Sequence, residues 1–224
     1  MAADRRQPEK RANVNLENYL QKVLPSSRIS MAIQQYHNKK QHKEPVIFIK
    51  PETALCDITQ PILLPKGLGT VHHEIELAVL IGTMLKQEND QDRIKSAIKG
   101  FAVALDLTLR DLQQTLKASG QPWEKSKAFD GACPISGFIA AHEFGDQQKA
   151  SLSLLVNNEI RQEGNTADML TAILPLISYI SRFFTLRPGD VILTGTPKGV
   201  GPLEVNDELT LHLNDRILKT RVIE

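Results

Sequence analysis

The sequence predicts an α+β domain that is rich in antiparallel strand. From Arg187 onward, turn signals alternate with short strand-like segments such as ELTLHL and RILKTRV. Residues 151–160 carry a hairpin signal, because SLSLLV runs into Asn157-Asn158 and the return strand begins at Ile160. Segments with a helical pattern are few, so the strands should make up most of the fold.

The first 45 residues differ from the rest of the chain. Residues 1–13 hold six charged side chains and little to bury, so we predict a disordered tail. Residues 14–24 have apolar positions at roughly helical spacing, and a proline follows them. ISMAI at 29–33 predicts a short strand, and the polar, basic run at 37–44 predicts a solvated loop.

The central part alternates strand-like and helical patterns. We expect a strand at 46–49, followed by a break at Pro51. Residues 71–82 are rich in apolar and β-branched residues, a pattern typical of a strand, and this pattern ends at Gly82. Further on we expect a short helix over 90–98 ended by Gly100, a buried strand at 101–107 and a helix through about 118.

Residues 166–184 carry the clearest long helical pattern. Thr166 is the expected N-cap, and Asp168 falls in the first turn, where a negative charge is favourable. Pro175 lies inside the pattern and predicts either a kink or a break into two helices.

Composition excludes several classes of protein. The 224 residues are enough for one domain with its own core. Lys+Arg minus Asp+Glu is 27 − 26 = +1, which argues against a nucleic-acid surface or a polybasic membrane patch. The longest apolar run, 172–180, is too short to span a bilayer, and the N-terminus lacks the apolar core of a signal peptide. Two cysteines do not make a disulfide framework. We therefore expect a cytoplasmic protein with reduced thiols.

Glu74 and Glu76 are the first candidate site residues. On a strand, residues two apart point to the same face, so two carboxylates would lie side by side in an apolar segment. Burial of that pair is costly unless a cation lies between the carboxylates. The alternative is a solvent-facing strand with two ordinary surface glutamates.

Asp106 strengthens the metal interpretation. It interrupts the apolar run FAVALDL, and it is either a helix N-cap or a third acidic ligand. Three carboxylates offer only oxygen ligands, which favours Mg²⁺ or Mn²⁺, with Ca²⁺ as a further option, over zinc. His72 and His73 adjoin the glutamates, and one of them is expected to have a structural or supporting role.

Cationic and polar residues follow Asp106 in the sequence. Arg110 and Gln113 lie at i+4 and i+7, on one side of a helical turn, and Lys127 comes later. Arg and Lys beside a carboxylate–metal cluster suit an anionic substrate, although surface salt bridges would also explain each of them alone. The stretch from Thr194 to Pro202 can expose backbone N–H groups to an anion, or it is simply a turn.

Five segments together closely resemble the fumarylacetoacetate hydrolase family, in particular its small members that act on acylpyruvates and oxaloacetate. The likeness runs from about Pro45 to the C-terminus, roughly four-fifths of the chain. The segments, in order, are FIKPETAL at 48–55, VHHEIELAVLIG at 71–82, ALDLTLRDLQ at 104–113, GQPWEKSKAFDGACP at 120–134 and PGDVILTGTPKGVGPL at 188–203.

The resemblance implies a fold, a set of roles and an assembly. The fold would be a β-rich roll of mixed sheet, and the protein would be a homodimer. Glu74, Glu76 and Asp106 match the metal-binding carboxylates, and Lys127 matches the catalytic lysine. Substrate-binding positions are matched by Arg110, Gln113 and Thr196. The implied division is a tail at 1–13, a divergent N-terminal segment and lid at 14–44, and a catalytic domain at 45–224.

The lid is where the sequence departs from the family. Members carry N-Y-x-x-H-x-x-E, whose His and Glu activate water, whereas here Lys39 takes the His position and His42 takes the Glu position. His37, His42 and Glu44 are the candidate replacements. Without the His/Glu pair, hydrolysis is affected more than the metal site is.

We therefore predict an enzyme that depends on Mg²⁺, with Mn²⁺ as the alternative, and acts on small 2-oxo acids with a second carbonyl. The ion would stabilise an enolate. Tautomerisation or decarboxylation of oxaloacetate is favoured, with acylpyruvate C–C hydrolysis close behind. The competing hypothesis is a member that binds metal and ligand without turnover. No nucleic-acid or membrane partner is expected.

Overall fold

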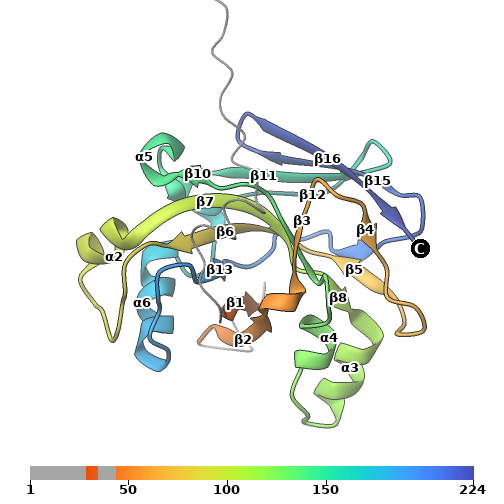
Figure 1. The fold of residues 1–224 in the computed structure, drawn as a ribbon, viewed down its shortest axis with the longest axis horizontal. Coiled ribbons are helices and arrows are strands. Elements are labelled where there is room, and N and C mark those ends of the chain that lie inside the picture. Colours follow the sequence, from red (N-terminus) through yellow and green to blue (C-terminus); the bar gives the residue numbers. More distant parts are fainter. Residues whose placement is uncertain (1–28, 35–43) are drawn as a thin grey trace, which may run out of the picture.

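The computed structural model describes residues 29–34 and 44–224. Strands dominate this part of the chain, and the few helices lie at its edges (Figure 1). The predicted α+β class with mixed sheet is confirmed. The predictions for 1–13, 14–24 and 37–43, and most of the proposed lid segment, lie outside the described residues.

The largest sheet contains eight strands. Their order is β2-β1-β13-β6-β7-β9-β3, and β10 also pairs with β7. The β1–β13 and β3–β9 pairs are parallel and the remaining pairs are antiparallel, so the sheet is mixed. The strands are β1 (Ile29–Gln34), β2 (Val46–Pro51), β3 (Leu55–Asp57), β6 (Ile75–Ile81), β7 (Ile98–Leu105), β9 (Cys133–Ile135), β10 (Ile139–Ala140) and β13 (Val191–Leu193).

Two smaller sheets complete the β structure. The five-stranded sheet has the order β12-β11-β15-β16-β4, and β11 and β15 pack against β6 and β7 of the large sheet (Figure 1). The three-stranded sheet has the order β14-β5-β8. The strands are β4 (Ile62–Leu63), β5 (Val71–His73), β8 (Thr108–Leu109), β11 (Ser151–Val156), β12 (Glu159–Asn165), β14 (Gly201–Pro202), β15 (Glu208–Leu213) and β16 (Arg216–Ile223).

The 151–165 hairpin forms as predicted. Asn157 and Asn158 connect β11 to β12 with positive φ values of 53° and 66°. Asparagine tolerates this left-handed conformation, and two such residues make the tight turn that matches the twist of paired strands.

The helices are short. They are α2 (Gln91–Ala97), α3 (Arg110–Ala118), α4 (Glu124–Lys127), α5 (Ala141–Phe144) and α6 (Ile173–Phe183), with 3-10 turns η1 (Glu52–Ala54), η2 (Gln147–Lys149) and η3 (Thr166–Asp168). In α2, the Asp90 carboxylate caps the first turn by accepting from the N–H groups of Asp92 and Arg93.

Gly100 does not end α2, contrary to prediction. The helix stops at Ala97, and Gly100 lies within β7. A Cβ atom added to Gly100 would lie 2.5 Å from the carbonyl oxygen of Ile139. Glycine is needed there for the close approach of β10 to β7.

The prediction of one long helix over 166–184 is also wrong for the first half of that range. Thr166 opens only the η3 turn, and α6 begins at Ile173. The buried Thr166 hydroxyl donates to the carbonyl oxygen of Gln147 and accepts from the N–H of Ala150, both at 2.8 Å, so it ties two loops together. Pro175 is the third residue of α6, in the first turn, where a helix needs no backbone donor.

β6 and β7 form the centre of the core. Every side chain of β6 is buried, and so is every side chain of β7 except Lys99. Polar groups placed at the ends of these strands are therefore shielded from solvent. None of the helices in the described ranges is long and apolar enough to cross a bilayer.

Candidate metal centre and substrate site

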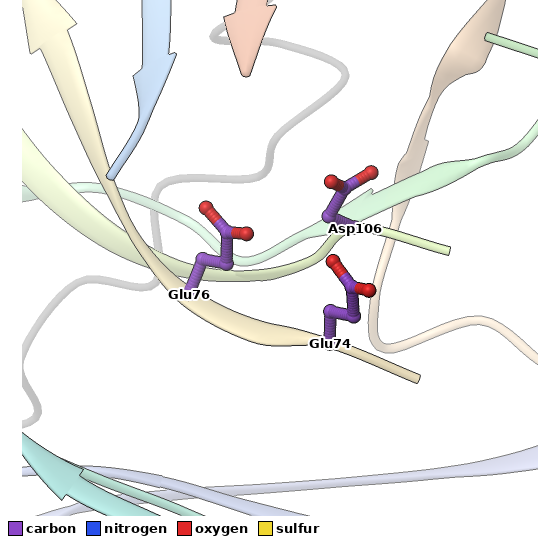
Figure 2. Close-up of side chains that lie close together, drawn as sticks. All are labelled: Glu74, Glu76 and Asp106. Atoms are coloured by element: carbon purple, nitrogen blue, oxygen red, sulfur yellow. The ribbon is translucent and has the colours of Figure 1, made fainter. Parts of the chain in front are cut away.

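The three predicted metal ligands come together where β6 and β7 meet. Ile75 pairs with Leu105, and the N–H of Asp106 donates to the carbonyl oxygen of Glu74 at 2.8 Å. This register sets Asp106 opposite Glu74. Glu74 lies between β5 and β6 and Glu76 lies within β6, so the chain is locally extended and both carboxylates point the same way (Figure 2).

The cluster is compact and buried. One ligand atom from each of Glu74, Glu76 and Asp106 lies within 4.8 Å of the other two (Figure 2). None of the three residues is more than 3% exposed. The surface alternative for the glutamates is therefore wrong. The N-cap alternative for Asp106 is wrong as well, because residue 109 occupies the cap position of α3.

Glu76 forms no ion pair with the cations around the triad in the described structure, and it lies beside two other carboxylates. Burial and the neighbouring charges of Asp106 and Glu74 hold the pKa of Glu76 well above its ordinary value. One Glu76 oxygen accepts from the backbone N–H of Gly195 at 2.5 Å. A divalent ion would relieve the repulsion, and the all-oxygen donor set suits Mg²⁺ or Mn²⁺.

Lys127 lies at the end of α4 and bridges two of the carboxylates. Its Nζ atom lies 2.8 Å from Glu74 Oε2 and 2.7 Å from Asp106 Oδ2. Burial alone would lower the pKa of Lys127, but the charges of Asp106 and Glu74 outweigh burial and raise that pKa. Lys127 is therefore a charged ammonium inside the cluster.

Lys50 is a second buried cation, and our sequence analysis missed it. Its Nζ atom lies 2.7 Å from Asp106 Oδ1, and it donates to the carbonyl oxygens of Lys127 and Ala132. Burial would raise the pKa of Asp106, but Lys127 and Lys50 together lower it. A lysine in the apolar strand VIFIKP was a signal that could have identified Lys50.

Arg110 and Gln113 are placed on α3 beside the cluster. The Arg110 guanidinium forms an ion pair with Glu74 and donates to Gln113 Oε1 at 2.7 Å. The helix begins at Arg110, so Asp106 lies outside it. The prediction that Arg110 and Gln113 share one side of a helical turn with Asp106 is therefore wrong. Gln113 is 1% exposed, and its Nε2 atom has no hydrogen-bond partner in the described structure. A buried donor of this kind suits a ligand oxygen.

Thr196 lies in the loop after β13, one residue beyond the glycine that contacts Glu76. Its hydroxyl donates to the carbonyl oxygen of Ile75 at 2.8 Å and accepts from Gln162 Nε2 at 2.7 Å. Gln162 is a second residue that sequence reasoning missed, because the segment RQEGN carries no local signal of burial.

The remaining candidates have other surroundings. The His73 ring meets Gln162 at 2.9 Å, which agrees with the supporting role expected for one of the two histidines. Glu44 accepts from the hydroxyl of Tyr179 at 3.1 Å. His37 and His42 lie outside the described residues. Burial raises the pKa of the Cys133 thiol to about 12, so Cys133 is not a candidate nucleophile.

A buried carboxylate triad inside a roll of mixed sheet, with lysines and an arginine around it, defines a class of enzymes that act on anionic substrates with a divalent metal. The chain belongs to the fumarylacetoacetate hydrolase family, since the family described as fumarylacetoacetate (FAA) hydrolase C-terminal matches residues 14–222.

Relatives agree with this membership. The chain is 60% identical to the oxaloacetate tautomerase YcgM of Escherichia coli K12 over 182 aligned residues. The aligned region covers 81% of this chain and 83% of that protein. A fumarylacetoacetate hydrolase family protein from Yersinia pestis CO92 superposes with a TM-score of 0.84 at 62% identity, over 87% of this chain and 92% of that one. The fumarylpyruvate hydrolase of Pseudomonas aeruginosa, solved with Mn²⁺ and pyruvate, superposes with a TM-score of 0.81 at 32% identity, over 88% of each chain.

Proposed function

We propose that this protein is a divalent-metal-dependent oxaloacetate tautomerase. The observation that carries the proposal is the 60% identity to an oxaloacetate tautomerase in a chain whose carboxylate triad is intact and buried. Glu74, Glu76 and Asp106 would hold the ion. When bound, the ion would act as a Lewis acid toward the 2-oxo acid.

The charge of the site fits a dianion. With all three carboxylates ionised, as metal binding requires, their formal charge is −3, and that of Lys50, Lys127 and Arg110 is +3, so the cluster of these six side chains sums to zero. A divalent cation would bring it to +2. Oxaloacetate carries two carboxylates, and its binding would return the site to neutrality. Electroneutrality is the condition under which buried charges cost least.

The chain's own residues supply binding and proton control. Lys127 Nζ is charged and buried, so it can stabilise negative charge that develops on the substrate. Gln113 Nε2 offers a donor with no partner among the described residues. Two of the five N–H groups of Arg110 serve Glu74 and Gln113, and the rest of the guanidinium can bind a substrate carboxylate.

Fumarylpyruvate-type hydrolysis is the second candidate, because the Pseudomonas aeruginosa neighbour is a fumarylpyruvate hydrolase. We rank it second because the His/Glu pair of the lid is absent from the sequence. Decarboxylation of oxaloacetate stays open beside tautomerisation. Metal and ligand binding without turnover is not favoured, since YcgM is named as an enzyme.

The test is an activity panel on the purified protein. Keto–enol conversion of oxaloacetate is followed by ultraviolet absorbance, and hydrolysis is measured with acetylpyruvate and fumarylpyruvate. Each substrate is assayed with Mg²⁺, with Mn²⁺ and with EDTA. We expect tautomerisation to exceed the other activities and to stop in EDTA. Absence of any metal-dependent acceleration would refute the proposal.

The finer features of the proposal are Mg²⁺ as the physiological ion, a homodimer and a cytoplasmic location. Supporting observations are the all-oxygen ligand set and the family resemblance. Sedimentation equilibrium tests the dimer, and competition between Mg²⁺ and Mn²⁺ in calorimetry tests the ion.

A further inference from the structure

Gln162 is buried in a strand whose other residues are exposed or half-buried. It is 1% exposed, whereas Ile160, two residues earlier on β12, is 63% exposed. Residues two apart on a regular strand share a face. The exception arises because the register shifts here: Leu154 pairs with Gln162, but Leu155 pairs with Ile160. This bulge turns the Gln162 side chain inward.

The Gln162 amide uses its full hydrogen-bonding capacity. Its Oε1 atom accepts from the N–H of Ile75 at 3.0 Å and lies 2.9 Å from Nδ1 of His73. Its Nε2 atom donates to Thr196 Oγ1 at 2.7 Å and to the carbonyl oxygen of Pro197 at 3.0 Å. The carbonyl of Pro197 can only accept, so the amide orientation is fixed, and Nδ1 of His73 is the donor to Oε1.

These partners belong to two segments that meet at the metal centre. His73 and Ile75 flank Glu74, and Ile75 also precedes Glu76. On the other side, Thr196 follows Gly195, whose N–H contacts Glu76. One side chain therefore bridges the segment that bears Glu74 and Glu76 and the loop that carries Gly195, Thr196 and Pro197.

Two glycines let the same loop pack directly on β12. A Cβ atom on Gly164 would lie 2.8 Å from Pro197 Cβ, and one on Gly199 would lie 1.9 Å from the carbonyl oxygen of Arg161. Gly199 also has a φ of 98°. The loop thus lies at backbone contact distance from β12, and Gln162 donates directly to Thr196 within it.

We propose that Gln162 is a positioning residue for the metal centre. It sets the distance between the Glu74–Glu76 segment and the Thr194–Gly199 loop, and it acts through Ile75, His73 and Thr196 without contact to the metal or the substrate. Residues that orient metal ligands in this way typically change metal affinity or activity by about ten- to a hundredfold when replaced. The activity part of the proposal rests on the proposed function.

The test compares two variants of Gln162, Gln162→Met and Gln162→Glu, with a matched control. Gln162→Met keeps the length and removes all four hydrogen bonds. Leu154→Ala is the control, because Leu154 is the buried cross-strand partner of Gln162 and has an apolar side chain. Calorimetry measures the affinity for Mn²⁺, and steady-state assays with oxaloacetate measure kcat and KM. Circular dichroism measures the midpoint of thermal unfolding.

We expect Gln162→Met to weaken Mn²⁺ binding and lower kcat by about tenfold or more, and Leu154→Ala to leave both near wild type at a similar loss of thermal midpoint. Equal losses of Mn²⁺ affinity in Gln162→Met and Leu154→Ala would overturn the proposal, because they would reflect instability alone. Wild-type affinity in Gln162→Met would overturn it as well.

Gln162→Glu covers the case in which Gln162→Met does not fold. It keeps an acceptor for Ile75 and His73 but removes both donors to the loop. We expect Mn²⁺ affinity to be retained while kcat/KM falls by about tenfold; unchanged kcat/KM would overturn the role in the loop. If the wild type lacks oxaloacetate activity but Gln162→Met still weakens Mn²⁺ binding, the proposed function fails and the positioning role stands.

Discussion

The Nζ atom of Lys50 lies 2.7 Å from Oδ1 of Asp106, and neither side chain is more than 1% exposed. Lys127 lies 2.7 Å from the other oxygen of the same carboxylate. Asp106 is therefore held between two cations that come from β2 and α4. The two ion pairs orient the Asp106 carboxylate, and a divalent ion would compete with Lys127 for one of its oxygens.

Lys50→Met is expected to destabilise the protein strongly. It leaves Oδ1 of Asp106 without its buried ion-pair partner and the carbonyl oxygen of Ala132 without its donor. Breaking a buried pair by removing one partner costs about 3–5 kcal/mol. Urea unfolding in EDTA measures the loss. The control is Lys66→Met, whose exposed pair with Glu224 should contribute about 0–1 kcal/mol. A similarly small loss of unfolding free energy in both variants would show that the Lys50–Asp106 pair does not stabilise the fold.

Glu74→Gln and Asp106→Asn are each expected to weaken divalent-ion binding and to remove most activity. Each change deletes one charged oxygen donor from the triad. Both variants should also lose stability, because Asp106 pairs with Lys50 and Lys127, and Glu74 pairs with Arg110 and Lys127. Binding is therefore measured at a temperature at which circular dichroism shows each variant to be folded. Calorimetry with Mn²⁺ measures the affinity, and Asp111→Asn, an exposed acid on α3, is the control. Wild-type affinity in the two triad variants would contradict the ligand assignment.

The stability of the metal-free protein should fall as pH rises above 4.5. The pKa of Glu76 is raised in the folded state by burial and by Asp106 and Glu74. Below the unfolded value of 4.5 the group is protonated in both states and adds no penalty. As pH rises toward the folded pKa, ionisation favours the unfolded state. Glu76→Gln should flatten this part of the pH profile of urea unfolding in EDTA. An unchanged profile would show that ionisation of Glu76 does not cause the loss of stability.

Lys127→Met is expected to reduce turnover by about a hundredfold or more, the size typical for loss of one preorganised charge donor. The variant keeps an unbranched apolar stem. Mn²⁺ binding should not weaken, because Lys127 competes with a cation for Glu74 and Asp106. Steady-state kinetics with oxaloacetate checks the first expectation and calorimetry the second. Near-normal turnover would leave Lys127 with a purely structural role.

Acylpyruvate hydrolysis should be slower than oxaloacetate tautomerisation in the wild type. The sequence lacks the family's lid His/Glu pair, and general-base assistance is worth about a hundred- to ten-thousandfold. We expect His37→Ala and His42→Ala to change neither rate greatly. Faster hydrolysis than tautomerisation in the wild type would contradict the idea. Loss of that hydrolysis in either histidine variant would identify a relocated base.

Local chemistry made much of the protein predictable. The hairpin at Asn157-Asn158 depends on residues within a few positions, so its sequence signal is complete. The carboxylates at 74, 76 and 106 were visible because each is a charge in an apolar segment. The position of Lys127 and Thr196 near the triad came from the family resemblance, since neither residue carries a local signal of its own.

Tertiary structure alone decided which residues support the triad and where the pattern at 166–184 breaks. Lys50 reaches Asp106 across 56 positions of sequence, and Gln162 reaches Ile75 across 87. Thr166 caps no long helix because its hydroxyl is used by Gln147 and Ala150. Hydrogen bonds and ion pairs between distant segments depend on which strands lie side by side, and periodicity within one segment does not say which distant segment it contacts.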